Sequence, residues 1–101
     1  MSVRCKFKVT QIAYSQGSRN LRDADGQWVK DERGYTKTEQ CRMATITMSP
    51  VYANGDPKHE NSQFWDASPG GEFKLNCVNE AAVAQLELGK EYYLDITPAA
   101  P

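Results

Sequence analysis

The segment HENSQFWDASPGGEFKLNCVNEAAVAQLELGKEYYLDITP, residues 59–98, decides the fold of this chain. Apolar and polar residues alternate over Gly71–Val78, which predicts a strand with one buried face. Asn79 is a favourable N-cap residue, and the residues after it predict one short helix near residues 80–87. Glu91–Thr97 predicts a closing strand. A strand, a short helix and a strand therefore follow one another with very short connections between them.

Two further strands are predicted before this segment. Val3–Tyr14 alternates with period two, but the apolar parity changes after Thr10. An extra residue in one strand produces such a change, so we expect a β-bulge there; the alternative is that the strand ends at Thr10. Cys41–Ala53 alternates Thr and Ser with apolar residues, which is typical of a strand with one face in water.

The region between these two strands, Ser15–Gln40, is rich in charge and poor in apolar residues. The pair Asp25-Gly26 predicts a tight turn, so we interpret the region, at about residues 15–40, as a long loop or hairpin insert. No internal repeat is apparent. A structureless loop of this length is unusual in a small domain, and this one retains Trp28 and Tyr35. We therefore expect a functional insert that orders against a partner, with packing of the hairpin on the domain as the alternative.

These elements predict a single all-β domain spanning residues 1–101. We expect a small barrel or sandwich of about five to six mostly antiparallel strands with one short helix. The side chains expected to point inward include Phe7, Ile46, Leu75, Val83 and Leu94.

Composition limits the function classes. The chain has 101 residues and a formal net charge of -1, so it lacks the basic excess that most nucleic-acid-binding proteins carry. No apolar run approaches the length that spans a bilayer, and no signal peptide is visible, so we expect no membrane association and synthesis in a reducing cytoplasm. The three cysteines, Cys5, Cys41 and Cys77, are widely spaced and are interpreted as buried, reduced thiols.

No pattern in the sequence predicts catalysis. His59 is the only histidine, and no nucleophile or set of metal ligands accompanies it at a characteristic spacing. We therefore expect no catalytic residues, no metal, no cofactor and no enzymatic activity.

Exposed aromatic and basic side chains are the candidate binding residues. The aromatic candidates for contact with a partner protein are Trp28, Tyr35, Phe64 and Trp65. For Trp65 the alternative is a structural role, plugging the end of the domain beneath its loop. One face of the first strand forms a basic stripe of Arg4, Lys6 and Lys8, which is either a possible nucleic-acid face or an ordinary solvated strand.

The phrase Asn61…Phe64-Trp65-Asp66-Ala67-Ser68-Pro69-Gly70-Gly71 and the ending Gly89-Lys90-Glu91-Tyr92-Tyr93-Leu94-Asp95 resemble a family of small tailed-bacteriophage proteins. The opening strand Arg4-Cys5-Lys6-Phe7-Lys8-Val9-Thr10 is similar to the start of that family as well. The resemblance covers residues 3–10 and 51–99. It implies a phage protein and supplies no catalytic residues.

The function expected from these observations is that of a phage virion structural protein, a decoration or cement protein that stabilises the capsid. Its partners are then the phage major capsid protein, other copies of this chain, or both, and its location is the virion after synthesis in the bacterial cytoplasm. One alternative is a single-stranded-DNA-binding protein of the OB type. Another is an inhibitor directed at a host protein.

Overall fold

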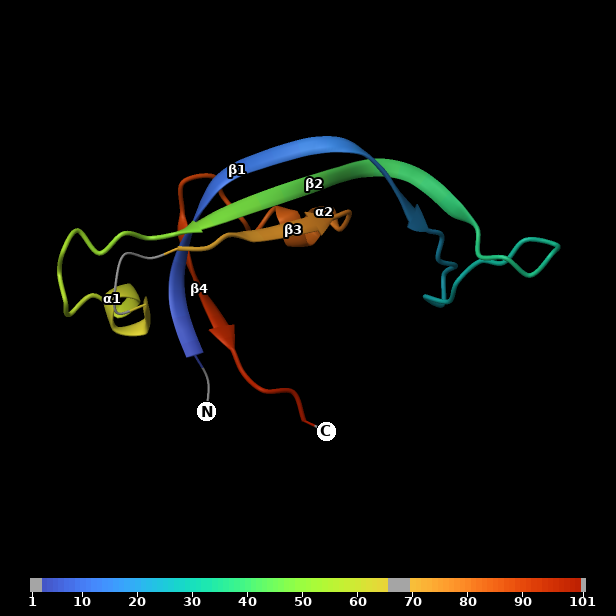
Figure 1. The fold of residues 1–101 in the computed structure, drawn as a ribbon. Helices are drawn as coiled ribbons and strands as arrows, with labels where there is room; N and C mark the ends of the chain where they lie inside the picture. The colour runs from blue at the N-terminus through green and yellow to red at the C-terminus, as the bar shows by residue number, and fades with distance from the viewer. Residues whose placement is uncertain (1–2, 66–69, 101) are drawn as a thin grey trace.

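The computed structural model describes residues 3–65 and 70–100, except for the side chain of Phe64. Four strands form one antiparallel sheet in the order β3-β2-β1-β4 (Figure 1). The strands are β1 (Val3–Asn20), β2 (Thr38–Pro50), β3 (Phe73–Cys77) and β4 (Glu91–Ile96). The expected all-β class and antiparallel pairing are confirmed.

The architecture differs from the expectation in three respects. The sheet is open, not closed into a barrel, and the described residues form four strands where five to six were expected. β3 and β4 lie on opposite edges of the long β1–β2 hairpin and are too short to wrap round and meet. There are two short helices instead of one, α1 (Glu60–Trp65) and α2 (Glu80–Val83), and α2 ends earlier than expected.

The β1–β2 hairpin contains the expected β-bulge. Val9 pairs with Met48 and Gln11 pairs with Thr47, so Thr10 is the extra residue. The bulge keeps the apolar residues of both halves of β1 on one face of the sheet, as the parity change predicted.

The core on that face is small. Its buried side chains are Cys5, Phe7, Val9, Ile46 and Met48. Trp65 of α1 and the pair Val83 and Leu86 of the α2 region pack against this cluster, together with Leu94 of β4. Leu75 lies on the same face but is 37% exposed, so the expectation that it belongs to the core is wrong. β3 is an edge strand with little packed over it, and alternation alone does not reveal how much of a face is covered.

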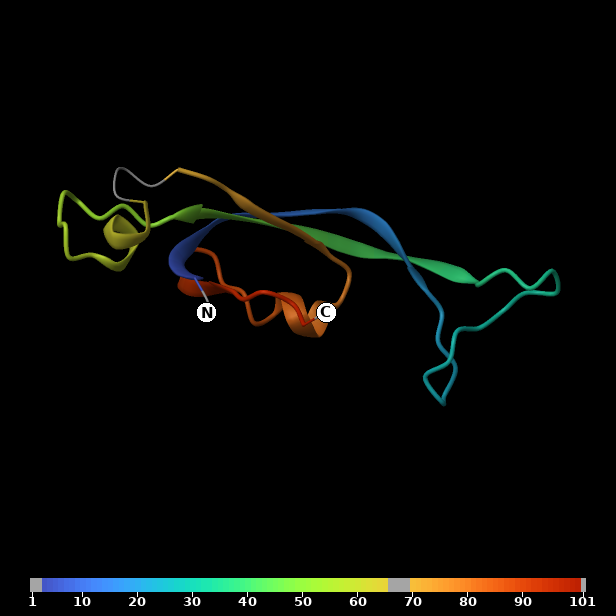
Figure 2. The same cartoon turned by 60° about the horizontal axis from the view of Figure 1, so that its bottom comes forward.

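The distal half of the hairpin extends beyond the rest of the sheet as an arm, which we define as residues 15–43. β4 pairs with β1 only up to Lys8, and β3 pairs with β2 only from Ala44 onward, so the arm has only two strands (Figure 2). The Cα radius of gyration is 18.4 Å, against about 13 Å for a compact domain of this length. The principal extents are 60 × 35 × 19 Å, and the molecule is therefore elongated.

The arm ends in a junction of three hairpin stems. Leu21 N donates to Lys37 O at 2.9 Å, Val29 N donates to Leu21 O at 3.0 Å, and Lys37 N donates to Val29 O at 2.8 Å. This closed triangle joins the β1–β2 stem to two small lobes. We call residues 22–28 the first lobe and residues 30–36 the second lobe; each is held by one bridge, Arg22 with Trp28 and Lys30 with Thr36.

The two lobes are copies of one turn design. In each, an aspartate carboxylate accepts two backbone hydrogen bonds at 2.9 and 3.0 Å, at Asp23 and at Asp31. Gly26 and Gly34 follow three residues later with φ of 80° and 86°, which favour glycine. LRDADGQW (21–28) and VKDERGYT (29–36) are thus an eight-residue repeat. The expectation of no repeat is wrong, and the insert is residues 21–37 because residues 15–20 and 38–40 are strand.

Candidate functional site

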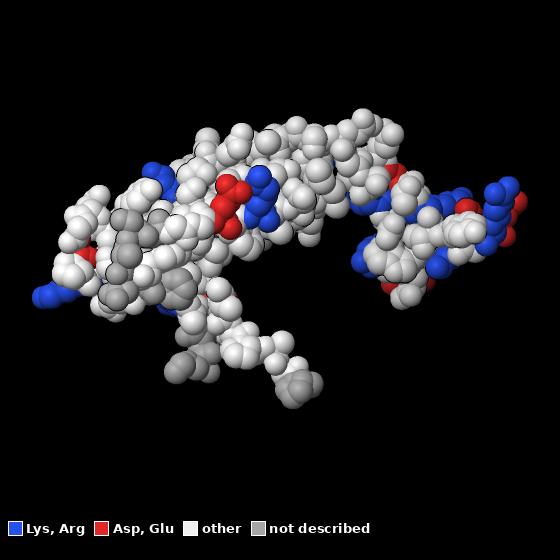
Figure 3. All heavy atoms as spheres, in the orientation of Figure 1, with Lys and Arg blue, Asp and Glu red and all other residues white. Residues whose placement is uncertain are grey.

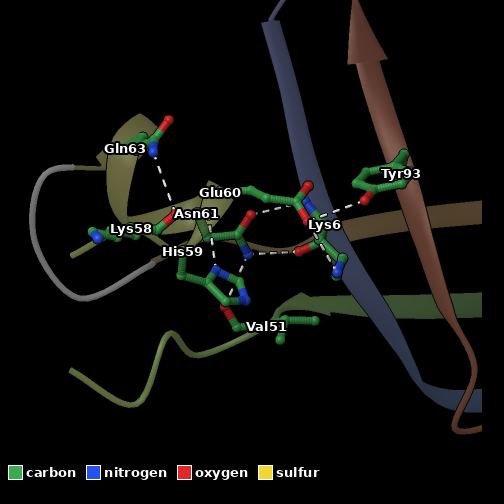
Figure 4. A network of polar contacts seen from close by, with 8 residues as sticks. All are labelled: Lys6, Val51, Lys58, His59, Glu60, Asn61, Gln63 and Tyr93. Atoms are coloured by element: carbon green, nitrogen blue, oxygen red, sulfur yellow. Dashed lines mark hydrogen bonds and ion pairs between the residues drawn. The ribbon is translucent and has the colours of Figure 1, made fainter. Parts of the chain in front are cut away.

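At the end of the molecule opposite the arm tip, α1 is attached to β1 through a buried asparagine (Figure 4). Asn61 is fully buried; its Oδ1 accepts from Lys6 N at 2.9 Å, and its Nδ2 donates to Lys6 O and to Val51 O at 2.8 Å each. His59, the lone histidine, accepts a hydrogen bond at Nδ1 from the Asn61 backbone N–H at 3.1 Å. These contacts have a structural role. The hydrogen-bond partner of the His59 ring is a backbone N–H group and not the side chain of a nucleophile.

The basic stripe on β1 is largely neutralised by acidic neighbours. Arg4 pairs with Asp95 at 2.7 Å, and Lys6 pairs with Glu60 at 3.1 Å. Hydrogen bonding from Arg4 lowers the pKa of Asp95, and hydrogen bonding from Lys6 lowers the pKa of Glu60.

Arg4 and Lys6 also contact an aromatic ring, and Lys8 has an acidic residue as its register partner. The Arg4 guanidinium and the Lys6 ammonium lie 4.7 and 5.5 Å from the centre of the Tyr93 ring, and Lys8 lies opposite Glu91 in the ladder. The stripe therefore offers few unpaired cations to a phosphate backbone.

Trp65 lies at the core, as the structural interpretation of this residue expected. Its ring centre is 6.1 Å from that of Phe7, and its indole Nε1 donates to Gly70 O at 2.9 Å. The backbone of Phe64 lies in α1, and its side chain falls outside the described part of the structure.

Trp28 and Tyr35 are both displayed at the arm tip. Trp28 in the first lobe is 45% exposed, and Tyr35 in the second lobe is 69% exposed. Arg22 lies over the Trp28 ring, with its guanidinium carbon 4.0 Å from the ring centre, and its Nη1 donates to Gly26 O at 2.8 Å. The structure thus separates the expected aromatic candidates into an exposed pair on the arm and Trp65 in the body.

A second arginine–aromatic stack lies nearer the body. Arg42 of β2 lies over Tyr14 of β1, 4.2 Å from the ring centre, and Tyr14 is 52% exposed. The stack forms one wall of a hollow of about 240 Å³ between the sheet and the α2 region. Pairing of Tyr14 with Ala44, and so its place near Arg42, depends on a register that the sequence alone does not fix.

Charge on the arm tip is dense but mixed. Lys, Arg, Asp and Glu side chains crowd the tip, whereas much of the sheet visible beside it carries no charge (Figure 3). Two of the aspartates, Asp23 and Asp31, are engaged in holding the turns of the lobes.

Within residues 3–65 and 70–100, no group of three or more His, Cys, Asp or Glu side chains is arranged to hold a metal ion. Over this same range, no helix has both the length and the apolar character needed to cross a membrane. All three cysteines are free. Cys5 is buried as expected, and burial raises the pKa of its thiol, whereas Cys41 and Cys77 are only partly buried, contrary to the expectation.

Comparison with protein-family models, with curated proteins and with solved structures yields no match.

Proposed function

We propose that this protein is a phage virion structural protein, a decoration or cement protein that acts through protein–protein contacts on the capsid. The observation that carries the proposal is the two-stranded arm with exposed aromatic side chains at its tip. A two-stranded ribbon is marginal in water by itself, because it has no third strand or helix to cover it. A partner surface, such as the outside of a capsid, would provide that cover.

The uncovered apolar residues of the sheet support the same proposal. Phe73 and Leu75 on edge strand β3 are each 37% exposed, and Ile96 at the end of β4 is 61% exposed. Edge strands with apolar side chains on one face are suited to pairing with another chain. Several weak contacts of this kind, repeated over a capsid lattice, bind more strongly than any one alone.

The alternatives receive less support from the geometry. A single-stranded-DNA-binding protein of the OB type needs a barrel and an excess of cations, whereas this sheet is open and two cations of its basic stripe are ion-paired. A host-directed inhibitor would use the same exposed surfaces as a capsid protein. The identity of the protein that is bound separates these two possibilities.

The test is co-sedimentation of the purified protein with capsids that lack it. An arm-deletion variant replaces residues 21–37 by Asn-Gly, because Asn20 pairs directly with Thr38 and a two-residue turn can close that pair. We expect the full chain to sediment with capsids and the arm-deletion variant to remain largely in solution while keeping its fold. Binding of an oligonucleotide at near-physiological salt, together with no capsid binding by the full chain, would overturn the proposal.

A further inference from the structure

The concave side of the arm contains two adjoining hollows, which together we call the arm groove. The first hollow, of about 240 Å³, is bounded by the Tyr14–Arg42 stack and by Val83 and Leu86. The second, of about 510 Å³, is bounded by Arg22 and Trp28 of the first lobe. Val78 and Glu80 line both hollows, so the two hollows adjoin at these residues.

At each end of the arm groove, the guanidinium group of an arginine lies over an aromatic ring. The guanidinium carbons of Arg22 and Arg42 lie 4.0 and 4.2 Å from the ring centres of Trp28 and Tyr14. Among the described residues, neither guanidinium has a carboxylate partner. Stacking restrains each arginine side chain in advance, so that less entropy is lost when a carboxylate binds to its remaining N–H groups; one N–H of Arg22 is already donated to Gly26 O.

The charge balance of the arm groove favours an acidic occupant that is not a polyphosphate. Arg19 is already paired with Glu39 at 2.7 Å, which leaves Arg22 and Arg42 against the single carboxylate of Glu80. The central Glu80 repels a continuous row of phosphates, but it tolerates an uncharged stretch between two separate carboxylates. Val78, which lines both hollows together with Glu80, suits an aliphatic side chain at that point.

The spacing of the two arginines sets the length of this occupant. Arg42 lies opposite Gln16, which precedes Arg22 by six residues along the chain. At the rise of an extended chain, the backbones of the two arginines are therefore at most roughly 20 Å apart. We propose that the arm groove binds an extended segment of a partner protein that carries an acidic residue at each end and an aliphatic residue between them. This inference rests on the proposed function, because it assumes that the protein acts by binding other proteins.

The probe is a synthetic peptide with glutamates roughly six residues apart, a central leucine and threonines elsewhere. Titration into isotope-labelled protein is followed by NMR through the indole N–H signal of Trp28 and the guanidinium signals of Arg22 and Arg42. We expect saturable shifts of these signals, and at least about tenfold weaker binding of a peptide in which glutamine replaces both glutamates. Arg22→Gln and Arg42→Gln should each weaken binding to a similar degree.

Arg33→Gln is the matched control, because it removes the same charge from the second lobe, which does not line the groove. A charge exchange tests for a gain of binding: the Arg42→Glu variant should bind a peptide with lysine in place of one glutamate more tightly than it binds the original peptide. Amide spectra and thermal melting of each variant establish that it is folded.

Three results would each overturn the inference: no peptide binding, equal binding of the glutamine peptide, or tighter binding of oligothymidylate at the same signals. Co-sedimentation separates this inference from the proposed function. If wild-type protein and Arg42→Gln bind capsids equally, only the arm groove is excluded. If the wild-type protein does not bind capsids at all, the proposed function itself fails.

Discussion

The side-chain amide of Asn61 takes the place of a neighbouring strand beside Lys6. It accepts from Lys6 N at 2.9 Å and donates to Lys6 O at 2.8 Å, as a backbone peptide group does in an antiparallel ladder. The register pairs Phe7 with Pro50, the last residue of β2, so β2 no longer runs as a strand beside Lys6. Asn61 thereby fixes the helix α1 to the sheet, together with the Lys6–Glu60 ion pair and the packing of Trp65 on the core.

Asn61→Ala should therefore lower the free energy of unfolding substantially. The substitution leaves the Lys6 backbone N–H and the Val51 carbonyl without partners, and each buried unsatisfied group costs about 1–3 kcal/mol. Urea denaturation followed by tryptophan fluorescence measures the change. Asn76→Ala is the control, because its side chain makes one exposed hydrogen bond, with Thr45, and should shift the midpoint only slightly. Equal effects of the two substitutions would contradict the role given to Asn61.

Gly17 lies where the arm leaves the body, and its lack of a side chain permits a close approach. A Cβ at this position would lie 2.9 Å from the Cβ of Met43 and 3.5 Å from a methyl of Val78. The Met43 Cβ is attached directly to the backbone of β2, so the strands must shift to accommodate it. Gly17→Ala should cost about 1–3 kcal/mol, in the range of overpacked sites. Ser18→Ala, one residue on, is the control in the same denaturation experiment, and a neutral Gly17→Ala would contradict the close packing.

Acid should destabilise the fold partly through two surface ion pairs. The pKa values of Glu60 and Asp95 are lowered from their ordinary values of 4.5 and 3.8 by hydrogen bonds from Lys6 and Arg4. A lowered carboxylate pKa stabilises the folded state above the unfolded pKa, and this contribution is lost as the pH falls through the folded value. The melting temperature should thus fall below pH 4 or so, and Glu60→Gln and Asp95→Asn should each reduce this fall. Glu87→Gln is the control, and the same pH profile for all variants would exclude the ion pairs as a cause.

The strands could be predicted from the sequence because their periodicity is local. The bulge at Thr10 and the N-cap at Asn79, whose side chain accepts from Ala81 N and Ala82 N, depend on only a few neighbouring residues. The helix α1 could not be predicted in this way, because its six residues make their stabilising contacts with distant parts of the chain, through Glu60, Asn61 and Trp65. The openness of the sheet likewise depends on where β3 pairs along β2.

The candidate site was only partly accessible to sequence reasoning. Trp28 and Tyr35 could be proposed because large aromatic residues stand out in a polar segment. The groove near Arg42 could not be proposed from the sequence, because its existence depends on the register of two distant strands and on the position of α2. The lobes are different: the spacing of Asp23 with Gly26 and of Asp31 with Gly34 was visible in the sequence, but a single pair of short copies is a weak signal.

Two paired aliphatic positions on the apolar face of the sheet should respond unequally to truncation. Ile46 is fully buried, so Ile46→Ala should cost about 2–5 kcal/mol. Leu75 pairs with Ile46 across β2 and β3 but is 37% exposed, so Leu75→Ala should lower the free energy of unfolding clearly less than Ile46→Ala does. The same substitution should weaken binding to capsids. Denaturation midpoints and co-sedimentation measure the two effects. Equal destabilisation would mean that β3 is covered within the monomer, contrary to its exposure.

Trp28→Ala should separate binding from stability. The Trp28 side chain is 45% exposed and contacts Arg22 within the first lobe, which lies at the far end of the arm from the core. Its loss should lower the melting temperature by only a few degrees, because about 1 kcal/mol shifts a domain of this size by 4–8 °C. Binding to capsids should weaken much more, since exposed tryptophans anchor interfaces. Tyr52→Ala is the matched control: Tyr52 is 67% exposed but lies in the body. If Trp28→Ala unfolded the protein while the remaining folded fraction bound normally, Trp28 would belong to the folding core and the arm tip would not be the contact surface.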